Sequence, residues 1–238
     1  MSKITLLEKH SYGYGLLTEQ DAGIISAEMN PQFMKEGHSM AHQTDSSMFS
    51  VEVNCILQKA DTENRNGRVY PLEILRREAQ KYQELINVGS ALGECNHPNE
   101  ITINLDNISH RVTKMWWEGN TLYGKLELIV TEQYALRGEY GGMVGDKLAI
   151  YLNKYKIKLG ISSRGVGSVR SVRGLDLVQE DFELVCFDTV SSPSTPGAYL
   201  FKGPVPGSSI NEQAISNKSL LSKDELKVKA FLTSFGKK

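Results

Sequence analysis

The sequence predicts an α+β protein in which strands dominate. Residues 49–57 alternate apolar and polar side chains with a period of two, as a strand with one buried face requires. Residues 108–116 and 121–130 are typical of two further strands, and residues 118–120 between them suit a hairpin turn. Because helices do not alternate with strands along most of the chain, the pattern disfavours an α/β-hydrolase fold.

One helix is predicted soon after the first strand. Pro71 stands at the first helical position, where a missing N–H group does no harm. The apolar residues that follow recur every three or four positions, so they form one stripe on a helix that ends near Gly89. Residues 1–48 show no sustained periodicity, and we expect a flexible amino-terminal arm or pro-segment there. The stripe consists of Leu72, Leu75, Ala79, Tyr82 and Ile86.

The second half of the chain predicts one more helix and two more strands. Asp146 is suited to cap a helix that stops at Gly160. A strand is expected from Ile161, and another over residues 182–190. Residues 203–219 are rich in Gly, Pro, Ser and Asn, which is typical of a linker. The predicted organisation is an arm over 1–48, one domain over 49–202, and a linker with a short final helix over 203–238.

Composition excludes several classes of function. The net charge is −1 and the pI is near 6.5, so no overall positive field draws the chain onto nucleic acid or an anionic membrane. No apolar run approaches the roughly 18 residues that span a bilayer. Cys55, Cys95 and Cys186 do not have a paired metal-binding spacing, and His38 and His42 lack a nearby acidic or cysteine partner. We expect a soluble intracellular protein without metal or cofactor.

Two short stretches carry the residue types needed for hydroxyl chemistry. One contains Ser162, Ser163 and Arg164, and the other, residues 93–98, contains His97. A serine hydroxyl is a weak nucleophile, so it needs a base to take its proton and donors to stabilise the oxyanion that follows. This combination favours a serine protease. On spacing alone, the two serines are more typical of an ordinary strand, and the arginine of a surface charge.

Four ordered motifs strengthen the hypothesis. They occupy residues 64–71 (NRNGRVYP), 93–98 (GECNHP), 115–120 (MWWEGN) and 160–165 (GISSRG). Together they resemble the prohead core proteases of large contractile-tailed phages, over roughly residues 49–199. That family is distantly similar to the herpesvirus capsid maturation protease. The resemblance therefore implies a closed β-barrel surrounded by helices.

The resemblance also implies roles for individual residues. His97 of the Asn-His-Pro element corresponds to the general base, and Ser162 corresponds to the nucleophile. Ser163 is the rival nucleophile, but adjacent side chains of a strand face opposite ways, so only one of the two serines can meet His97. Arg164 is implied to support the oxyanion, with a structural ion pair as the alternative.

A third group must orient the imidazole and stabilise its protonated form. In related capsid proteases an acid lies in a late strand, and the corresponding residue is Asp188. Glu94 and His110 remain alternatives, because herpesvirus relatives use a second histidine.

The function implied by the resemblance is prohead maturation inside the prohead core, in the host bacterial cytoplasm. The substrates would be phage scaffold or core proteins, capsid proteins and finally the chain itself, and homo-oligomers are compatible with this role. The family prefers to cut after glutamate when an aliphatic residue lies two positions earlier. Glu8, Glu19 and Glu212 fit that pattern and are the predicted autocleavage sites. The alternative is an inactive scaffold or assembly protein with the same fold.

Overall fold

The structure, a computed structural model, describes residues 5–6, 15–19 and 51–203. Four antiparallel strands form what we call the hairpin sheet, in the order β3-β7-β6-β5. The predicted hairpin is confirmed, because β6 and β7 pair along their length and Gly119 takes the left-handed φ of 58° at the turn. The bounds are β3 Glu52–Lys59, β5 Leu92–Glu94, β6 Ile108–Glu118 and β7 Thr121–Leu128.

A second antiparallel sheet, the serine sheet, contains Ser162 and Ser163 and has the strand order β1-β2-β8-β11. In it β8 lies between β2 and β11, and all eight of its residues are buried. Strand β2 comes from within the predicted amino-terminal arm, so residues 15–18 are part of a sheet. The bounds are β1 Thr5–Leu6, β2 Gly15–Thr18, β8 Gly160–Gly167 and β11 Glu183–Val190.

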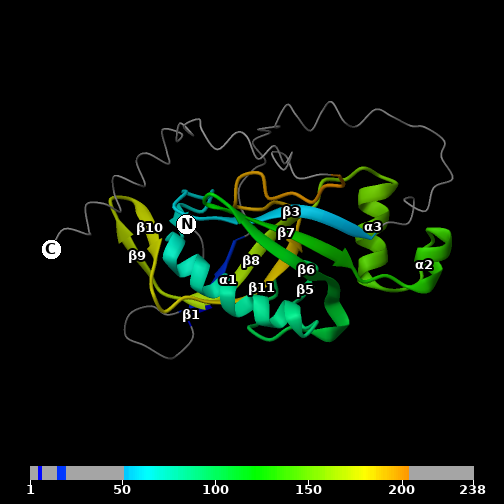
Figure 1. Ribbon diagram of the computed structural model, residues 1–238, viewed down its shortest axis with the longest axis horizontal. Coiled ribbons are helices and arrows are strands. Elements are labelled where there is room, and N and C mark those ends of the chain that lie inside the picture. The colour runs from blue at the N-terminus through cyan, green and yellow to red at the C-terminus, as the bar shows by residue number, and fades with distance from the viewer. Residues whose placement is uncertain (1–4, 7–14, 20–50, 204–238) are drawn as a thin grey trace, which may run out of the picture.

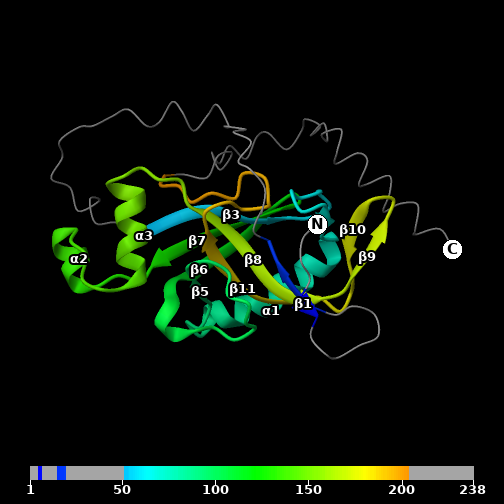
Figure 2. The same cartoon turned by 180° about the vertical axis from the view of Figure 1, so that it is seen from behind.

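Three helices and a small sheet complete the described fold. The small sheet has the order β4-β10-β9 and lies at one end of the molecule, whereas α2 and α3 lie at the other (Figures 1 and 2). The long predicted helix is confirmed as α1, which starts directly after Pro71. The bounds are β4 Arg68–Val69, β9 Val169–Val172, β10 Leu175–Val178, α1 Leu72–Asn87, α2 Glu132–Arg137, α3 Val144–Asn153 and a 3₁₀ turn Leu105–Asn107.

The main core lies between the hairpin sheet and the serine sheet. Leu57 of β3, Leu126 of β7 and Ile161 of β8 are fully buried in it, and the apolar stripe of α1 contributes Tyr82. A smaller cluster beneath the start of α1 joins Leu17 of β2 to residues of α1 and the small sheet. Both sheets are thereby held together by side-chain burial, the main source of stability in a domain of this size.

The predicted closed β-barrel is wrong. The described strands form three open sheets, and one isolated bridge, between Cys95 just after β5 and Thr189 of β11, links the hairpin and serine sheets directly. The reason lies in β5, which has three residues and a register shift between Gly93 and Glu94. Its chain then turns away at Asn96, where φ is 65°. A strand this short cannot form the continuous ladder that closure requires.

Several predictions fall on residues that the structure does not describe. They include the autocleavage sites Glu8 and Glu212, most of the arm and the final helix. Within the described ranges, none of the helices combines the length and the apolar character that a bilayer crossing demands.

Candidate active site

Strand β8 positions Ser162 at the centre of the serine sheet. Ser162 is paired with Asp188 on β11, and antiparallel partners that lie directly opposite present their side chains on the same face. Gly165 allows the tight packing around this strand, because a Cβ there would stand 2.5 Å from the ring of Phe182. The buried sheet therefore fixes a hydroxyl and a carboxylate side by side.

His97 reaches the same place from a loop beyond β5. The amide of Asn96 donates to the carbonyl of Thr189 at 2.7 Å, which ties this loop to β11. Asn96 adopts the left-handed conformation that asparagine tolerates better than most residues, and Pro98 restricts the conformation of His97. These features turn the imidazole toward the serine sheet, where its side chain is only 4% exposed.

The three side chains form a continuous relay. His97 Nε2 lies 3.0 Å from Ser162 Oγ, and His97 Nδ1 lies 2.7 Å from Asp188 Oδ2. With Nδ1 protonated, the ring donates to the carboxylate and offers a free lone pair on Nε2 to the serine proton. This is the arrangement in which an imidazole acts as general base while an acid orients it.

Asp188 is held as a carboxylate by its neighbours. Burial alone would raise its pKa, but the hydrogen bond with His97 and the charge of Arg164 outweigh burial and lower the pKa of Asp188 below its ordinary value. The backbone amide of Glu94 donates to Asp188 Oδ1 at 3.0 Å. The group therefore stays ionised at neutral pH and can stabilise a protonated His97.

Arg164 lies beside the acid. Its guanidinium donates to Glu94 Oε1 at 2.8 Å and to the carbonyl of Glu100 at 2.8 Å, and its Nε lies 2.9 Å from Asp188 Oδ2. These contacts match the alternative prediction for Arg164, a structural ion pair. The oxyanion role predicted for Arg164 has no support in them, because they lie on the acid side of the relay.

The alternative site residues are buried nearby, but they make other contacts. Ser163 accepts a hydrogen bond from Gln58 at 3.0 Å, on the face of β8 opposite to Ser162. The carboxylate of Glu94 faces Arg164 and Asn107. His110 is fully buried against the carbonyl of Phe187, and burial lowers its pKa from 6.5 to about 4. None of the three contacts His97.

The backbone of Glu19 lies directly against Ser162. Strand β2 runs antiparallel to β8, and the amide of Glu19 donates to the carbonyl of Ser163 at 3.2 Å. The carbonyl oxygen of Glu19 accepts a hydrogen bond from the Ser194 amide at 3.0 Å and also lies within hydrogen-bonding reach of the Ser162 hydroxyl, whose single proton points either to this oxygen or to His97 Nε2. A peptide carbonyl of the chain itself thus occupies the position in front of the hydroxyl.

The carboxylate of Glu19 lies in a fully buried cradle. Arg68 Nη1 lies 2.7 Å from Oε1, and the Tyr70 hydroxyl donates to the same oxygen. Oε2 accepts from Asn64 Nδ2 at 2.6 Å, Ser194 Oγ at 2.8 Å and Asn66 Nδ2 at 3.1 Å.

The sequence analysis assigned no role to the residues that donate hydrogen bonds to the Glu19 carboxylate. A usable signal was present, since Arg68 and Tyr70 are two apart and must share a face of an extended segment.

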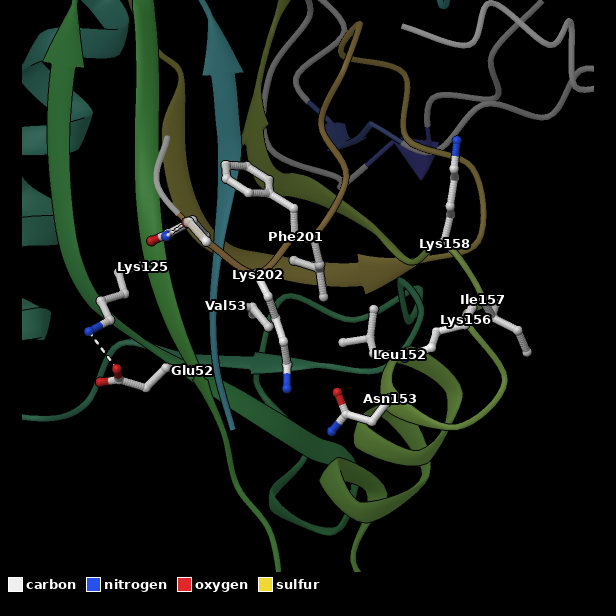
Figure 3. A pocket seen from close by; sticks show the side chains of 13 residues that line it. Glu52, Val53, Lys125, Leu152, Asn153, Lys156, Ile157, Lys158, Phe201 and Lys202 are labelled. Atoms are coloured by element: carbon white, nitrogen blue, oxygen red, sulfur yellow. Dashed lines mark hydrogen bonds and ion pairs between the residues drawn. The ribbon is translucent and has the colours of Figure 1, made fainter. Parts of the chain in front are cut away.

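A separate hollow of about 860 Å³ lies between the start of β3, the end of α3 and residues 200–203 (Figure 3). Its lining includes the apolar residues Leu152, Val53 and Phe201 and the basic residues Lys156 and Lys202. Its lining includes none of the relay residues and none of the Glu19 cradle. The chemistry of the site therefore lies elsewhere.

Comparisons with known proteins bear on the same residues. The model of the family described as prohead core protein serine protease matches residues 11–209, which include the relay and Glu19. The prohead core protein protease of Enterobacteria phage T4 is 36% identical over 148 residues, and the match covers 61% of this chain and 65% of that relative. The solved structure of the bacteriophage T4 capsid assembly protease matches with a TM-score of 0.52 and 32% identity, over 58% of this chain and 80% of that one.

Proposed function

Because the chain belongs to the prohead core protein serine protease family, we propose that it is a serine endopeptidase of prohead maturation. One observation carries the proposal. Ser162, His97 and Asp188 form a relay with separations of 3.0 and 2.7 Å, and a peptide carbonyl lies against the serine. Activation of a serine for acyl transfer requires this set of neighbours.

The mechanism follows from the contacts. His97 Nε2 removes the proton of Ser162 as Oγ attacks the peptide carbonyl, and the same nitrogen then delivers that proton to the leaving amine. Asp188 holds the imidazole in the required tautomer and stabilises its charge. Water repeats the sequence on the acyl-enzyme and releases the product. Arg164 and the Glu94 amide act through Asp188, because they fix its orientation and ionisation.

The substrates proposed are phage scaffold or core proteins and capsid proteins, cleaved after glutamate inside the prohead core of the infected bacterium. The support is the description of the T4 relatives as a prohead core protein protease and a capsid assembly protease. Homo-oligomers are compatible with this role, and neither nucleic acid nor a membrane is needed for it.

We also propose that the chain processes itself after Glu19, Glu8 and Glu212. Glu19 is the best supported, because its carbonyl lies directly against the Ser162 hydroxyl. Cleavage at these positions would trim the arm over 1–48 and the tail over 203–238 from the protease domain.

An active-site probe tests the proposal. A serine-directed fluorophosphonate should add one label per chain, at Ser162, as found by intact mass and peptide mapping. Ser162→Ala should abolish the label, and Ser163→Ala should retain it. An unlabelled chain would favour the alternative, an inactive assembly protein with this fold.

A further inference from the structure

The cradle around Glu19 has no part in the proton relay, yet it is the most elaborate polar cluster outside it. The carboxylate is fully buried and receives donors from three separate parts of the chain: residues 64–66, strand β4 with its following Tyr70, and the loop at Ser194. A buried charge costs several kcal/mol unless it is paired and hydrogen-bonded throughout. Such a cluster is therefore built around a carboxylate.

The position of the cradle beside the nucleophile indicates what it binds. Glu19 is anchored on both sides of its α-carbon, by the Ser163 carbonyl at its amide and by Ser162 and the Ser194 amide at its carbonyl. The residue that supplies the carbonyl under attack must lie against the nucleophile in this way. We propose that the cradle is the S1 subsite of the protease, where Arg68 and Tyr70 recognise a glutamate immediately before the scissile bond. This assignment rests on the proposed function.

The donor set selects glutamate against close analogues. Oε1 of Glu19 accepts hydrogen bonds from Arg68 and Tyr70. Oε2 accepts hydrogen bonds from Asn64, Asn66 and Ser194, so every donor faces an acceptor oxygen. A glutamine would turn an NH₂ group toward one of these sets of donors and would remove the carboxylate charge that faces Arg68. An aspartate is one methylene too short to reach both sets. An apolar side chain would remove the carboxylate that accepts from the buried guanidinium and from the other donors, which is strongly unfavourable.

The strand that leads into the cradle shows how the rest of such a peptide binds. Residues 15–18 add to the edge of β8 as an antiparallel strand, with Thr18 opposite Arg164 and Leu17 opposite Gly165. Leu17 is buried in the small cluster with Tyr70 and Phe182. Backbone pairing supplies affinity and the side-chain pockets supply selectivity in this mode of peptide recognition. Residues 15–19 therefore compete with any other peptide for the edge of β8 and the cradle.

The test compares two peptides within each enzyme variant. The substrates are acetyl-Gly-Leu-Leu-Thr-Glu and acetyl-Gly-Leu-Leu-Thr-Gln, each joined to a fluorogenic amine and assayed with the full chain. Competition by residues 15–19 affects both substrates equally, so it cancels from the ratio of their kcat/KM values. We expect the unaltered chain to prefer Glu by about 100-fold or more, the scale on which a buried polar site rejects a mismatched analogue.

The variants locate the source of that preference. Arg68→Gln should reduce the Glu/Gln ratio to within about 10-fold of unity, and Tyr70→Phe should reduce it by about 10-fold, as expected for loss of a buried charge and of one buried donor. The matched control is Arg111→Gln, which alters a partly exposed arginine paired with Glu127 and should leave the ratio unchanged. If Arg68→Gln does not fold, Tyr70→Phe and Ser194→Ala decide the question.

Fluorophosphonate labelling separates the two possible failures. A ratio that stays the same in folded Arg68→Gln or Tyr70→Phe, with Ser162 still labelled, would overturn the S1 assignment alone. A chain that labels nowhere would remove the proposed function and the assignment with it.

Discussion

Two buried arginine–carboxylate clusters flank Ser162, and they differ in what the carboxylate faces. On one side Arg164 holds Asp188, which also contacts the ring of His97. On the other side Arg68 holds Glu19, whose own carbonyl lies at the serine hydroxyl. Both pairs are almost completely buried, so burial and charge alone do not separate them. The partner beyond the carboxylate, an imidazole or a peptide bond, therefore determines whether such a pair orients a base or recognises a substrate.

The clusters also differ in how the chain builds them. Asp188 and Arg164 lie on neighbouring strands of the serine sheet, so their pairing is part of the sheet itself. Glu19 follows β2, while Arg68 belongs to β4 of a different sheet. A carboxylate on a separate strand can be exchanged for one from another peptide, whereas Asp188 cannot be exchanged without dismantling the sheet.

The largest expected effect comes from the acid of the relay. Asp188→Asn should lower kcat about 10³- to 10⁴-fold, because an amide neither stabilises a protonated His97 nor secures its tautomer. Steady-state hydrolysis of the Glu peptide measures it, with circular dichroism to check folding. Glu94→Gln is the control, since that carboxylate does not contact His97, and it should cost far less. Near-normal turnover in Asp188→Asn with an inactive Glu94→Gln would transfer the role to Glu94.

A smaller effect should distinguish the two arginines. The charge of Arg164 helps to lower the pKa of Asp188. Arg164→Gln removes this positive charge, which opposes proton binding by the relay, so the acidic limb of the pH–rate profile should shift to higher pH. We expect a loss of about 10- to 100-fold in kcat near pH 7, with partial recovery in Arg164→Lys. Arg68→Gln should lower kcat/KM for the Glu peptide without moving the acidic limb. A limb that shifts equally in both variants would contradict the separate roles.

The smallest effect concerns stability on the acid side of the relay. Burial holds the pKa of His110 at about 4, compared with 6.5 for an exposed histidine. The unfolded chain therefore binds more protons than the folded one between these values, and His110 makes the folded state less stable as the pH falls from 6.5 to 4. His110→Gln should remove about 3 kcal/mol of this pH dependence. Urea unfolding of both proteins at pH 7, 5.5 and 4 measures it, and parallel pH profiles would show that His110 is not buried in its neutral form.

Periodic elements were predictable from sequence because their signals are local. The hairpin, α1 and the strand that carries Ser162 follow from spacing and turn residues. Strand β2 was missed, because Gly15, Leu16 and Leu17 are all buried and so show no alternation of apolar and polar residues. The barrel was inferred from a distant relative, and the short β5 does not support it.

The site itself was only partly accessible from sequence. Ser162 and His97 stand out as residue types, but the contact between His97 and Asp188 joins positions 91 residues apart, and no local pattern encodes it. The resemblance to a known family supplied that pairing. The Glu19 cradle joins distant segments of the chain: Glu19 after β2, Arg68 of β4 and the Ser194 loop. No local sequence pattern therefore encodes it.

In the proposed mechanism Ser162 attacks the carbonyl of a glutamate seated in the cradle. This step is tested by intact-mass analysis of the purified chain, aged in solution beside Ser162→Ala and Ser163→Ala. We expect a new amino terminus at Gln20 in the unaltered chain, together with loss of the segment after Glu212, and an intact Ser162→Ala protein. Equal cleavage of the unaltered chain and Ser162→Ala, or an intact Ser163→Ala beside a cleaved Ser162→Ala, would contradict it.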